Sequence, residues 1–272
     1  MDMTLVIRCG SDPKVFDCIS SVDEDVEILV SSMPNPDFED RLRESGVNVC
    51  TSPSGNLSVA SNVGIKFASF DKVFLTDSDT VLAKGCLSTV YNLLDEYPVV
   101  CARIVFEDDG TRLSRRVADA RSFVNSKKLA FTPGLGFDRR VADSIGGYMF
   151  DDDVPFAVDA NLDFRLKHNG VPVSYGSTAT IHHSMESVRH DMVAARRIGA
   201  GVQKGAERLE TMYPEVSFIE IRRSLKAVHW NDYPTIISRY GLGTALYQAV
   251  WDLNFYIGRA GLWGKTATIS SE

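Results

Sequence analysis

Short apolar runs alternate with amphipathic segments through the first 75 residues. Each run has the length of a buried strand, and the segments between the runs carry helix start and stop signals. The expected strands are Thr4–Ile7, Val26–Val30, Val47–Cys50 and Lys72–Leu75, and the expected helices are Asp12–Ser21, Phe38–Ser45 and Leu57–Ser69. This alternation predicts an α/β domain with a mostly parallel sheet, in which ligands bind at the carboxyl ends of the strands.

The pattern becomes less regular in the middle of the chain and changes again near Met185. Beyond Met185 the sequence predicts a C-terminal extension of long helices with scattered basic residues. In between we expect a helix at Leu87–Leu94, a strand at Val99–Val105, a polar surface loop or flap at Arg112–Lys128, a glycine-containing segment at Leu129–Phe137, helices at Arg139–Ile145 and Val158–His168, and strand character at Val171–His183.

Composition narrows the class of protein. The chain has 272 residues, 44% apolar and 24% charged, which fits one large domain or one domain with an extension. A net charge of −7 disfavours a broad contact with a phosphate backbone, so we expect no nucleic-acid partner.

The cysteines and the apolar runs bear on the compartment. The five cysteines form no Cys-x-x-Cys pair, which argues against a disulfide framework and a structural zinc site. The first residues do not resemble a signal peptide, and no run of about 20 apolar residues occurs. We therefore expect a cytoplasmic protein with reduced thiols, with peripheral contact to the inner face of a membrane as an alternative.

Two carboxylates one residue apart interrupt an apolar stretch at the end of the fourth expected strand. Asp77 and Asp79 follow Val73–Leu75, whereas the Asp23/Asp25 and Asp151/Asp153 pairs lie in polar loops where solvated charge is the simpler interpretation. Two oxygen ligands at this edge of a sheet suit Mg²⁺ or Mn²⁺ together with a phosphate-bearing substrate. A plain turn that ends the strand is the alternative.

Two later features favour the metal interpretation. Asp159 opens the helix expected at Val158–His168, although an aspartate there can also be a simple cap. The strand-like segment that follows ends in His182 and His183, which would point to opposite faces of a strand.

This order of motifs resembles an inverting family 2 glycosyltransferase of the GT-A fold. The resemblance covers roughly residues 4–185, and the family has a mostly parallel central sheet flanked by helices. The motifs that carry it are TLVIRCGSD, GNLSVASNVGIKFA, VFLTDSDTVL, GFDRRVADSIGGYMF and VDANLDFRLKHNG. It implies a catalytic domain at 1–185, with a nucleotide-sugar half at about 1–105 and an acceptor half at about 106–185, followed by the helical extension at 186–272.

The resemblance also implies roles for single residues. Asp159 matches the catalytic base, and Asp79 matches the direct metal ligand of a pair that includes Asp77. His183 matches the family's spacing from Gly170 better than His182 does, and so is the expected third ligand of Mn²⁺ or Mg²⁺. The residues expected to bind the sugar nucleotide are Arg8, Cys9, Gly10, Ser31, Ser32, Asn62, Asp77 and Ser78.

The sequence departs from the family pattern at several positions. Val158 stands where Glu is usual and Asn161 where Asp is frequent, which leaves the base intact but alters its neighbours. Ser31 and Ser32 stand where an Asp commonly contacts uracil, and Ser61 stands where an Arg is frequent. These positions therefore do not determine which nucleotide the donor carries.

These features predict a metal-dependent glycosyltransferase, of hexosyltransferase type, acting on a nucleoside-diphosphate sugar. UDP- and GDP-sugars are the expected donors, and the acceptor is open among a glycan, a lipid-linked molecule, a protein and a small molecule. The alternatives are a nucleotidyltransferase or related enzyme and a degenerate sugar-nucleotide-binding protein. The single glycine in Cys9–Lys14 argues against a nucleotidyltransferase, whereas the missing Glu at position 158 keeps the binding protein open.

The extension leaves further alternatives. Residues 186–210 predict either a solvated helix or a mobile lid whose Arg189 and His190 reach the diphosphate. The aromatic-rich segment at 241–264 has few charges and predicts packing on the catalytic domain, a homodimer contact or placement on a membrane surface.

Overall fold

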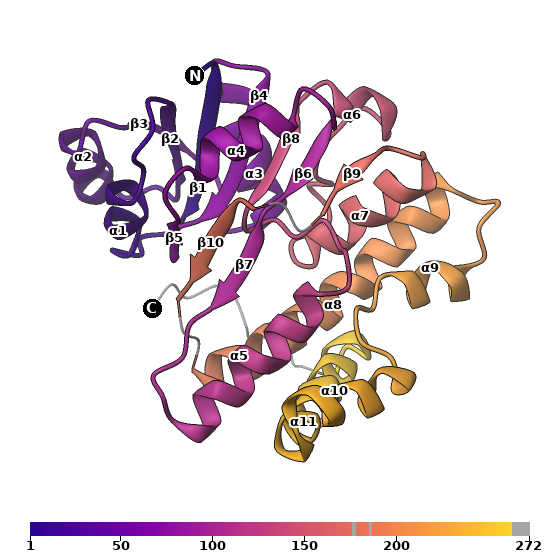
Figure 1. The fold of residues 1–272 in the computed structure, drawn as a ribbon. Coiled ribbons are helices and arrows are strands. Elements are labelled where there is room, and N and C mark those ends of the chain that lie inside the picture. Colours follow the sequence, from indigo (N-terminus) through magenta and orange to yellow (C-terminus); the bar gives the residue numbers. More distant parts are fainter. Residues whose placement is uncertain (176–177, 185–186, 263–272) are drawn as a thin grey trace.

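The computed structural model describes residues 1–175, 178–184 and 187–262. Its central layer is a seven-stranded sheet with the order β3-β2-β1-β4-β8-β6-β9, covered by helices on both faces (Figure 1). The strands are β1 (Met3–Cys9), β2 (Glu27–Ser32), β3 (Asn48–Thr51), β4 (Lys72–Asp77), β6 (Val99–Cys101), β8 (Leu135–Asp138) and β9 (Val173–Ser174). The sheet is mostly parallel because β8 alone of these strands runs against its two neighbours.

Alternating side chains of the strands build two apolar layers. In β1, Leu5 and Ile7 face one layer and Val6 faces the other, as the two-residue period of a strand requires. The first layer is covered by α1 (Val15–Ser20), α2 (Pro36–Glu44) and α4 (Cys86–Leu93), and the second by α3 (Leu57–Phe67), α6 (Val141–Ser144) and α7 (Val158–His168). The α/β architecture predicted from the alternating pattern is confirmed, and the helix at 158–168 has the predicted bounds.

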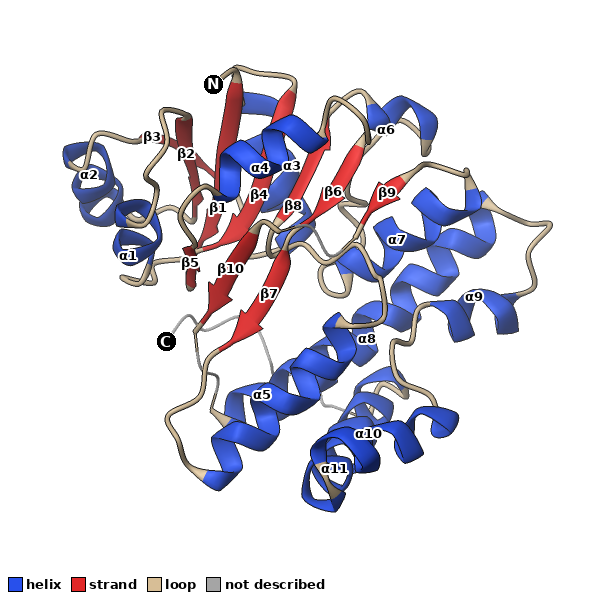
Figure 2. Ribbon diagram, in the orientation of Figure 1, coloured by secondary structure: helices blue, strands red, loops and turns tan. Residues whose placement is uncertain are grey.

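A second sheet of three strands projects from the first (Figure 2). It has the order β5-β10-β7 and comprises β5 (Thr80–Leu82), β7 (Arg103–Phe106) and β10 (Thr180–His183). The prediction of one strand at 99–105 was wrong, because the chain leaves the main sheet at Ala102 and continues as β7 in the small sheet.

The expected surface loop at 112–128 is instead helix α5 (Arg112–Asn125). The hydroxyl of Thr111 caps it by accepting from the Ser114 amide, 3.2 Å away. Val117, Ala120 and Phe123 recur at helical spacing between the charged residues and are buried. The glycine-containing segment at 129–137 supplies strand β8, which the sequence analysis did not assign.

The C-terminal segment is helical, as predicted. It contains α8 (Val188–Met212), α9 (Phe218–Ser224), the short 3-10 helix η1 (Trp230–Asp232), α10 (Tyr233–Tyr240) and α11 (Leu242–Arg259). Among the described helices, none combines the length and apolar character that a bilayer crossing requires. The expected boundary at 185/186 and residues 263–264 lie outside the described residues.

Helices α8 and α11 touch backbone to backbone through glycine. A Cβ atom on Gly199 would lie 2.0 Å from the carbonyl oxygen of Phe255, and one on Gly258 would lie 1.9 Å from that of Arg196. The segment at 241–262 therefore packs on the rest of the chain, which is one of its three predicted placements. The outer face of α11 still exposes Leu242, Leu246, Val250 and Leu253, so the homodimer and membrane placements remain predictions.

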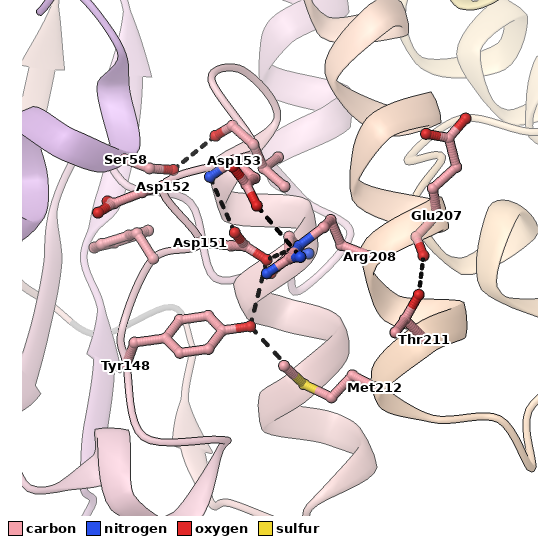
Figure 3. A network of polar contacts seen from close by, with 12 residues as sticks. Ser58, Tyr148, Asp151, Asp152, Asp153, Glu207, Arg208, Thr211 and Met212 are labelled. Carbon is pink, nitrogen blue, oxygen red and sulfur yellow. Dashed lines mark hydrogen bonds and ion pairs between the residues drawn. The ribbon is translucent and has the colours of Figure 1, made fainter.

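An ion-pair network joins α8 to the loop before α7 (Figure 3). Asp151 is buried, and its Oδ2 accepts a 2.9 Å hydrogen bond from Nε of Arg208, whose Nη1 lies 3.3 Å from Asp153. The interpretation of Asp151 as solvated surface charge was therefore wrong, because Arg208 reaches it from a helix far along the chain.

We expect Arg208→Ala to destabilise the protein by about 1–3 kcal/mol, because it leaves the Asp151 carboxylate buried without its cationic partner. Urea denaturation followed by circular dichroism measures the loss. The double variant Asp151→Asn, Arg208→Ala should recover part of the stability, and an equal or larger loss in the double variant would contradict the assignment.

Candidate active site

A groove of about 900 Å³ lies where β1 to β4 end. The turn after β1 forms one side, the residues after β2 and β3 form another, and the Asp77–Asp79 segment after β4 forms the floor. Of the predicted nucleotide-binding residues, the groove includes Arg8, Cys9, Gly10, Asp77 and Ser78. This edge of a parallel sheet is where α/β folds bind ligands.

Arg8 and Asp77 stand opposite each other on the neighbouring strands β1 and β4. Arg8 is buried, and its Nε and Nη2 lie 2.8 and 2.6 Å from Oδ1 of Asp77. The same guanidinium donates to the hydroxyls of Thr132 and Ser61, at 2.9 and 3.4 Å. The ion pair thus fixes Asp77 in place and ties it to the loop before β8 and to α3.

Asp79 lies beside His183, although the two residues are 104 positions apart in the sequence. His183 is the last residue of β10 and pairs in register with Thr80, the residue after Asp79. Its Nε2 lies 3.7 Å from Oδ1 of Asp79, while its Nδ1 lies 2.9 Å from the carbonyl oxygen of Ser184. His182 points elsewhere and lies 2.7 Å from Glu107.

Donor atoms for a metal are therefore few but close together. Among the described residues, no group of three or more His, Cys, Asp and Glu side chains converges. Asp79 and His183 form a pair, whereas Asp77 is occupied by Arg8. Two protein ligands suit a divalent ion that keeps water and substrate oxygens in its shell.

Three of the predicted nucleotide-binding residues line none of the described hollows. Ser31 and Ser32 are fully buried in β2, and the Ser31 hydroxyl donates to the carbonyl oxygen of Ala60 at 2.8 Å. The Asn62 amide donates to the Phe150 carbonyl and to Asp152, at 2.7 and 2.8 Å. The structure thus gives these side chains packing contacts and does not bring them to the groove.

Cys9 and Arg189 differ in accessibility. Cys9 is buried at the end of β1, and burial raises the pKa of its thiol to about 11. Arg189 is exposed in the first turn of α8, next to His190, which lines the groove.

Asp159 is held at the start of α7 by an unusual backbone. The preceding Ala157 has φ of 56° and ψ of 34°, a left-handed conformation that costs an alanine roughly 1–2 kcal/mol. Strain of this kind concentrates at functional sites. The amide of Ala160 donates to the Asp159 carboxylate at 2.9 Å, and the Asp159 backbone amide also contributes.

The environment of Asp159 changes its acidity. Burial raises the pKa of this carboxyl to about 6, against the lowering effects of the Ala160 amide and the charge of Arg8. A carboxyl with this pKa is ionised at neutral pH and is still a better proton acceptor than an exposed aspartate.

Two further hollows continue from the groove toward Asp159. One of about 440 Å³ shares Asp77, Asp79 and His190 with the groove. The other, of about 220 Å³, shares Arg121 and His183 with the 440 Å³ hollow and has Asp159 in its wall. Along this path the groove comes first, then Asp79 and His183, and then Asp159, whose pKa is raised.

Several site residues escaped the sequence analysis. Arg121 was assigned to a surface loop, yet α5 places it between the two inner hollows. Thr132 holds Arg8, and Lys14 donates to Ser184 at 2.9 Å across the groove mouth. Helical spacing in 112–125 was the available signal for Arg121, whereas no local pattern marks Thr132.

We expect Asp159→Asn to raise the melting temperature by a few degrees at pH 7.5 and to change it little at pH 4. The folded-state pKa exceeds the usual value of 3.8, so the ionised carboxyl weakens the fold increasingly as pH rises from about 4 to about 6. Calorimetry at both pH values measures this. The exposed Asp143→Asn is the control, and a lower melting temperature for Asp159→Asn at pH 7.5 would refute the expectation.

Comparison with known proteins agrees with this geometry. The family model described as glycosyl transferase family 2 matches residues 20–151. Two crystal structures of S. aureus TarS 1–349 are similar to the chain. The complex with UDP has a TM-score of 0.53 and 16% sequence identity, and the complex with UDP-GlcNAc has a TM-score of 0.50 and 15% sequence identity. Each alignment covers 96% of this chain and 91% of the TarS chain. Comparison with curated proteins found no match. Residues 20–151 therefore match the glycosyl transferase family 2 model, and the chain has a GT-A-like fold similar to that of TarS.

Proposed function

We propose that the protein is a glycosyltransferase that moves a sugar from a nucleoside-diphosphate sugar to an acceptor hydroxyl with inversion at the anomeric carbon. Asp159 is the general base. The observation that carries the proposal is the half-buried Asp159 carboxyl, with a pKa raised to about 6, at the inner end of a path that begins in the groove.

The donor occupies the groove and the 440 Å³ hollow. The nucleoside lies against the turn after β1, and the diphosphate lies near Asp79, His183 and Lys14. A UDP-sugar is the first choice because the similar TarS structures hold UDP and UDP-GlcNAc, and a GDP-sugar is the second. Arg189, exposed at the start of α8, is placed to approach the diphosphate once the donor is bound.

Asp79 and His183 would hold Mn²⁺ or Mg²⁺. Their side chains already lie 3.7 Å apart. His183 ends β10 and Asp79 immediately precedes β5, so the pairing of these two strands fixes the separation. When bound, the ion would neutralise negative charge on the diphosphate leaving group. Asp77 contributes through its pair with Arg8 rather than as a direct ligand.

The transfer requires a group that accepts the proton of the acceptor hydroxyl and a path along which the hydroxyl oxygen can attack the anomeric carbon. Asp159 takes the proton of the acceptor hydroxyl while that oxygen bonds to the anomeric carbon. The bond from the anomeric carbon to the diphosphate oxygen breaks, and the nucleoside diphosphate leaves with the electron pair. Because attack and departure occur on opposite faces, the anomeric configuration inverts.

We expect Asp159→Asn to lower kcat by about 10²–10⁴-fold, since the amide cannot accept the proton. In the wild type, kcat/KM should rise with pH up to about 6 and then level, because the base must be ionised. Release of nucleoside diphosphate from a panel of sugar nucleotides with Mn²⁺ measures both quantities. Full transfer activity in Asp159→Asn would refute the base, and pyrophosphate release would favour a nucleotidyltransferase.

We expect Asp79→Ala to weaken donor binding in Mn²⁺ by at least about tenfold, because a metal ligand is lost. Calorimetric titration with UDP-GlcNAc, with Mn²⁺ and with a chelator, separates metal-dependent from direct binding. The two proteins should bind equally in chelator. Asp25→Ala removes an exposed carboxylate from another Asp-x-Asp pair and is the control, and equal binding by Asp79→Ala in Mn²⁺ would contradict the ligand assignment.

A further inference from the structure

The hollow of about 220 Å³ beside Asp159 is walled by the C-terminal helices and by the acceptor half of the domain. Its lining from the C-terminal segment is largely apolar and includes Ile198, Leu225, Ala227, Val228, Trp251 and Phe255. The opposite wall is also apolar and includes Ile104, Phe106, Val124, Leu129 and Phe131. We call this hollow the apolar cavity.

The charged side chains in its wall are engaged with other groups. Arg121 stacks over the ring of Trp251 at 4.5 Å and its Nη2 donates to Gln248 at 3.1 Å, while its buried Nε makes no hydrogen bond to a described residue. Lys226 donates to Asp252 at 3.1 Å and to Tyr256 at 3.0 Å. Both cations are thus held by groups of the protein.

Asp163 is engaged as well. Its Oδ1 accepts from the Ala130 amide at 3.0 Å, and its Oδ2 pairs with Lys167 at 2.7 Å. Asp159, by contrast, accepts from backbone amides, that of Ala160 at 2.9 Å, and from no side chain of the described residues. A polyol would lose hydrogen bonds to water in this cavity without replacing them, whereas an apolar group would lose none.

We propose, as an extension of the proposed function, that the acceptor presents a hydroxyl carried on a compact apolar group, aromatic or aliphatic, which fills the apolar cavity. A dry cavity of about 150 Å³ holds benzene, so 220 Å³ corresponds to about nine non-hydrogen atoms. The hydroxyl proton passes to Asp159, the oxygen bonds to the anomeric carbon, and the nucleoside diphosphate departs.

The test compares 4-ethylphenol with xylose, a polyol of similar size, as acceptors for the sugar nucleotide that the panel identifies. We expect kcat/KM for 4-ethylphenol to exceed that for xylose by at least about tenfold. Ala227→Phe, which fills the cavity, should lower the 4-ethylphenol value by at least about tenfold and lower the xylose value by less. Ala200→Phe, at an exposed position of α8, is the matched control.

Leu129→Ala enlarges the cavity and gives a second variant should Ala227→Phe fail to fold. It should shift the preference from 4-ethylphenol toward the larger 2-naphthol, and an unchanged preference would overturn the proposal. Preference of the wild type for xylose would also overturn it.

Calorimetric binding of 4-ethylphenol without donor separates this inference from the proposed function. Binding to the wild type that is lost in Ala227→Phe supports an apolar ligand in the cavity, even when no sugar is transferred. A lack of transfer in that case counts against the proposed function alone. No binding to the wild type overturns the inference and leaves donor hydrolysis as evidence for the transferase.

Discussion

The ion pair between Arg8 and Asp77 is the contact on which the site depends. It joins adjacent parallel strands at their carboxyl ends, so the sheet register itself places cation and carboxylate together. Because Arg8 is buried, its charge must be compensated within the protein, and Asp77 provides the compensation. The same cation also acts on Asp159, where it offsets part of the rise in pKa caused by burial.

The small sheet positions Asp79 and His183, the second pair of side chains in the site. Its strands come from three distant parts of the chain, and the pairing of β5 with β10 brings Asp79 beside His183. The left-handed backbone at Ala157 then sets the start of α7, and with it Asp159. A β framework thus positions Asp79 and His183, while a strained helix start positions Asp159.

Local sequence patterns were sufficient for the main elements and for the position of the acidic pair at the end of a strand. The strand-helix alternation predicted the α/β sheet, and the apolar run before Asp77 placed the pair at a strand end. Patterns could not show that Arg8 captures Asp77, or that Ser31 and Ser32 face inward, because both depend on contacts between strands. Helix α5 was missed because its charged residues masked an apolar stripe of small side chains.

The glycine contacts between α8 and α11 have a consequence for how substrate range can change. Ile198 on α8 and Phe255 on α11 face the apolar cavity, and Gly199 and Gly258 set how closely these two helices approach. A bulkier residue at either glycine would force the helices apart and widen the cavity without altering any side chain in its lining. The dimensions of the apolar cavity are therefore determined in part by two glycines that do not line it.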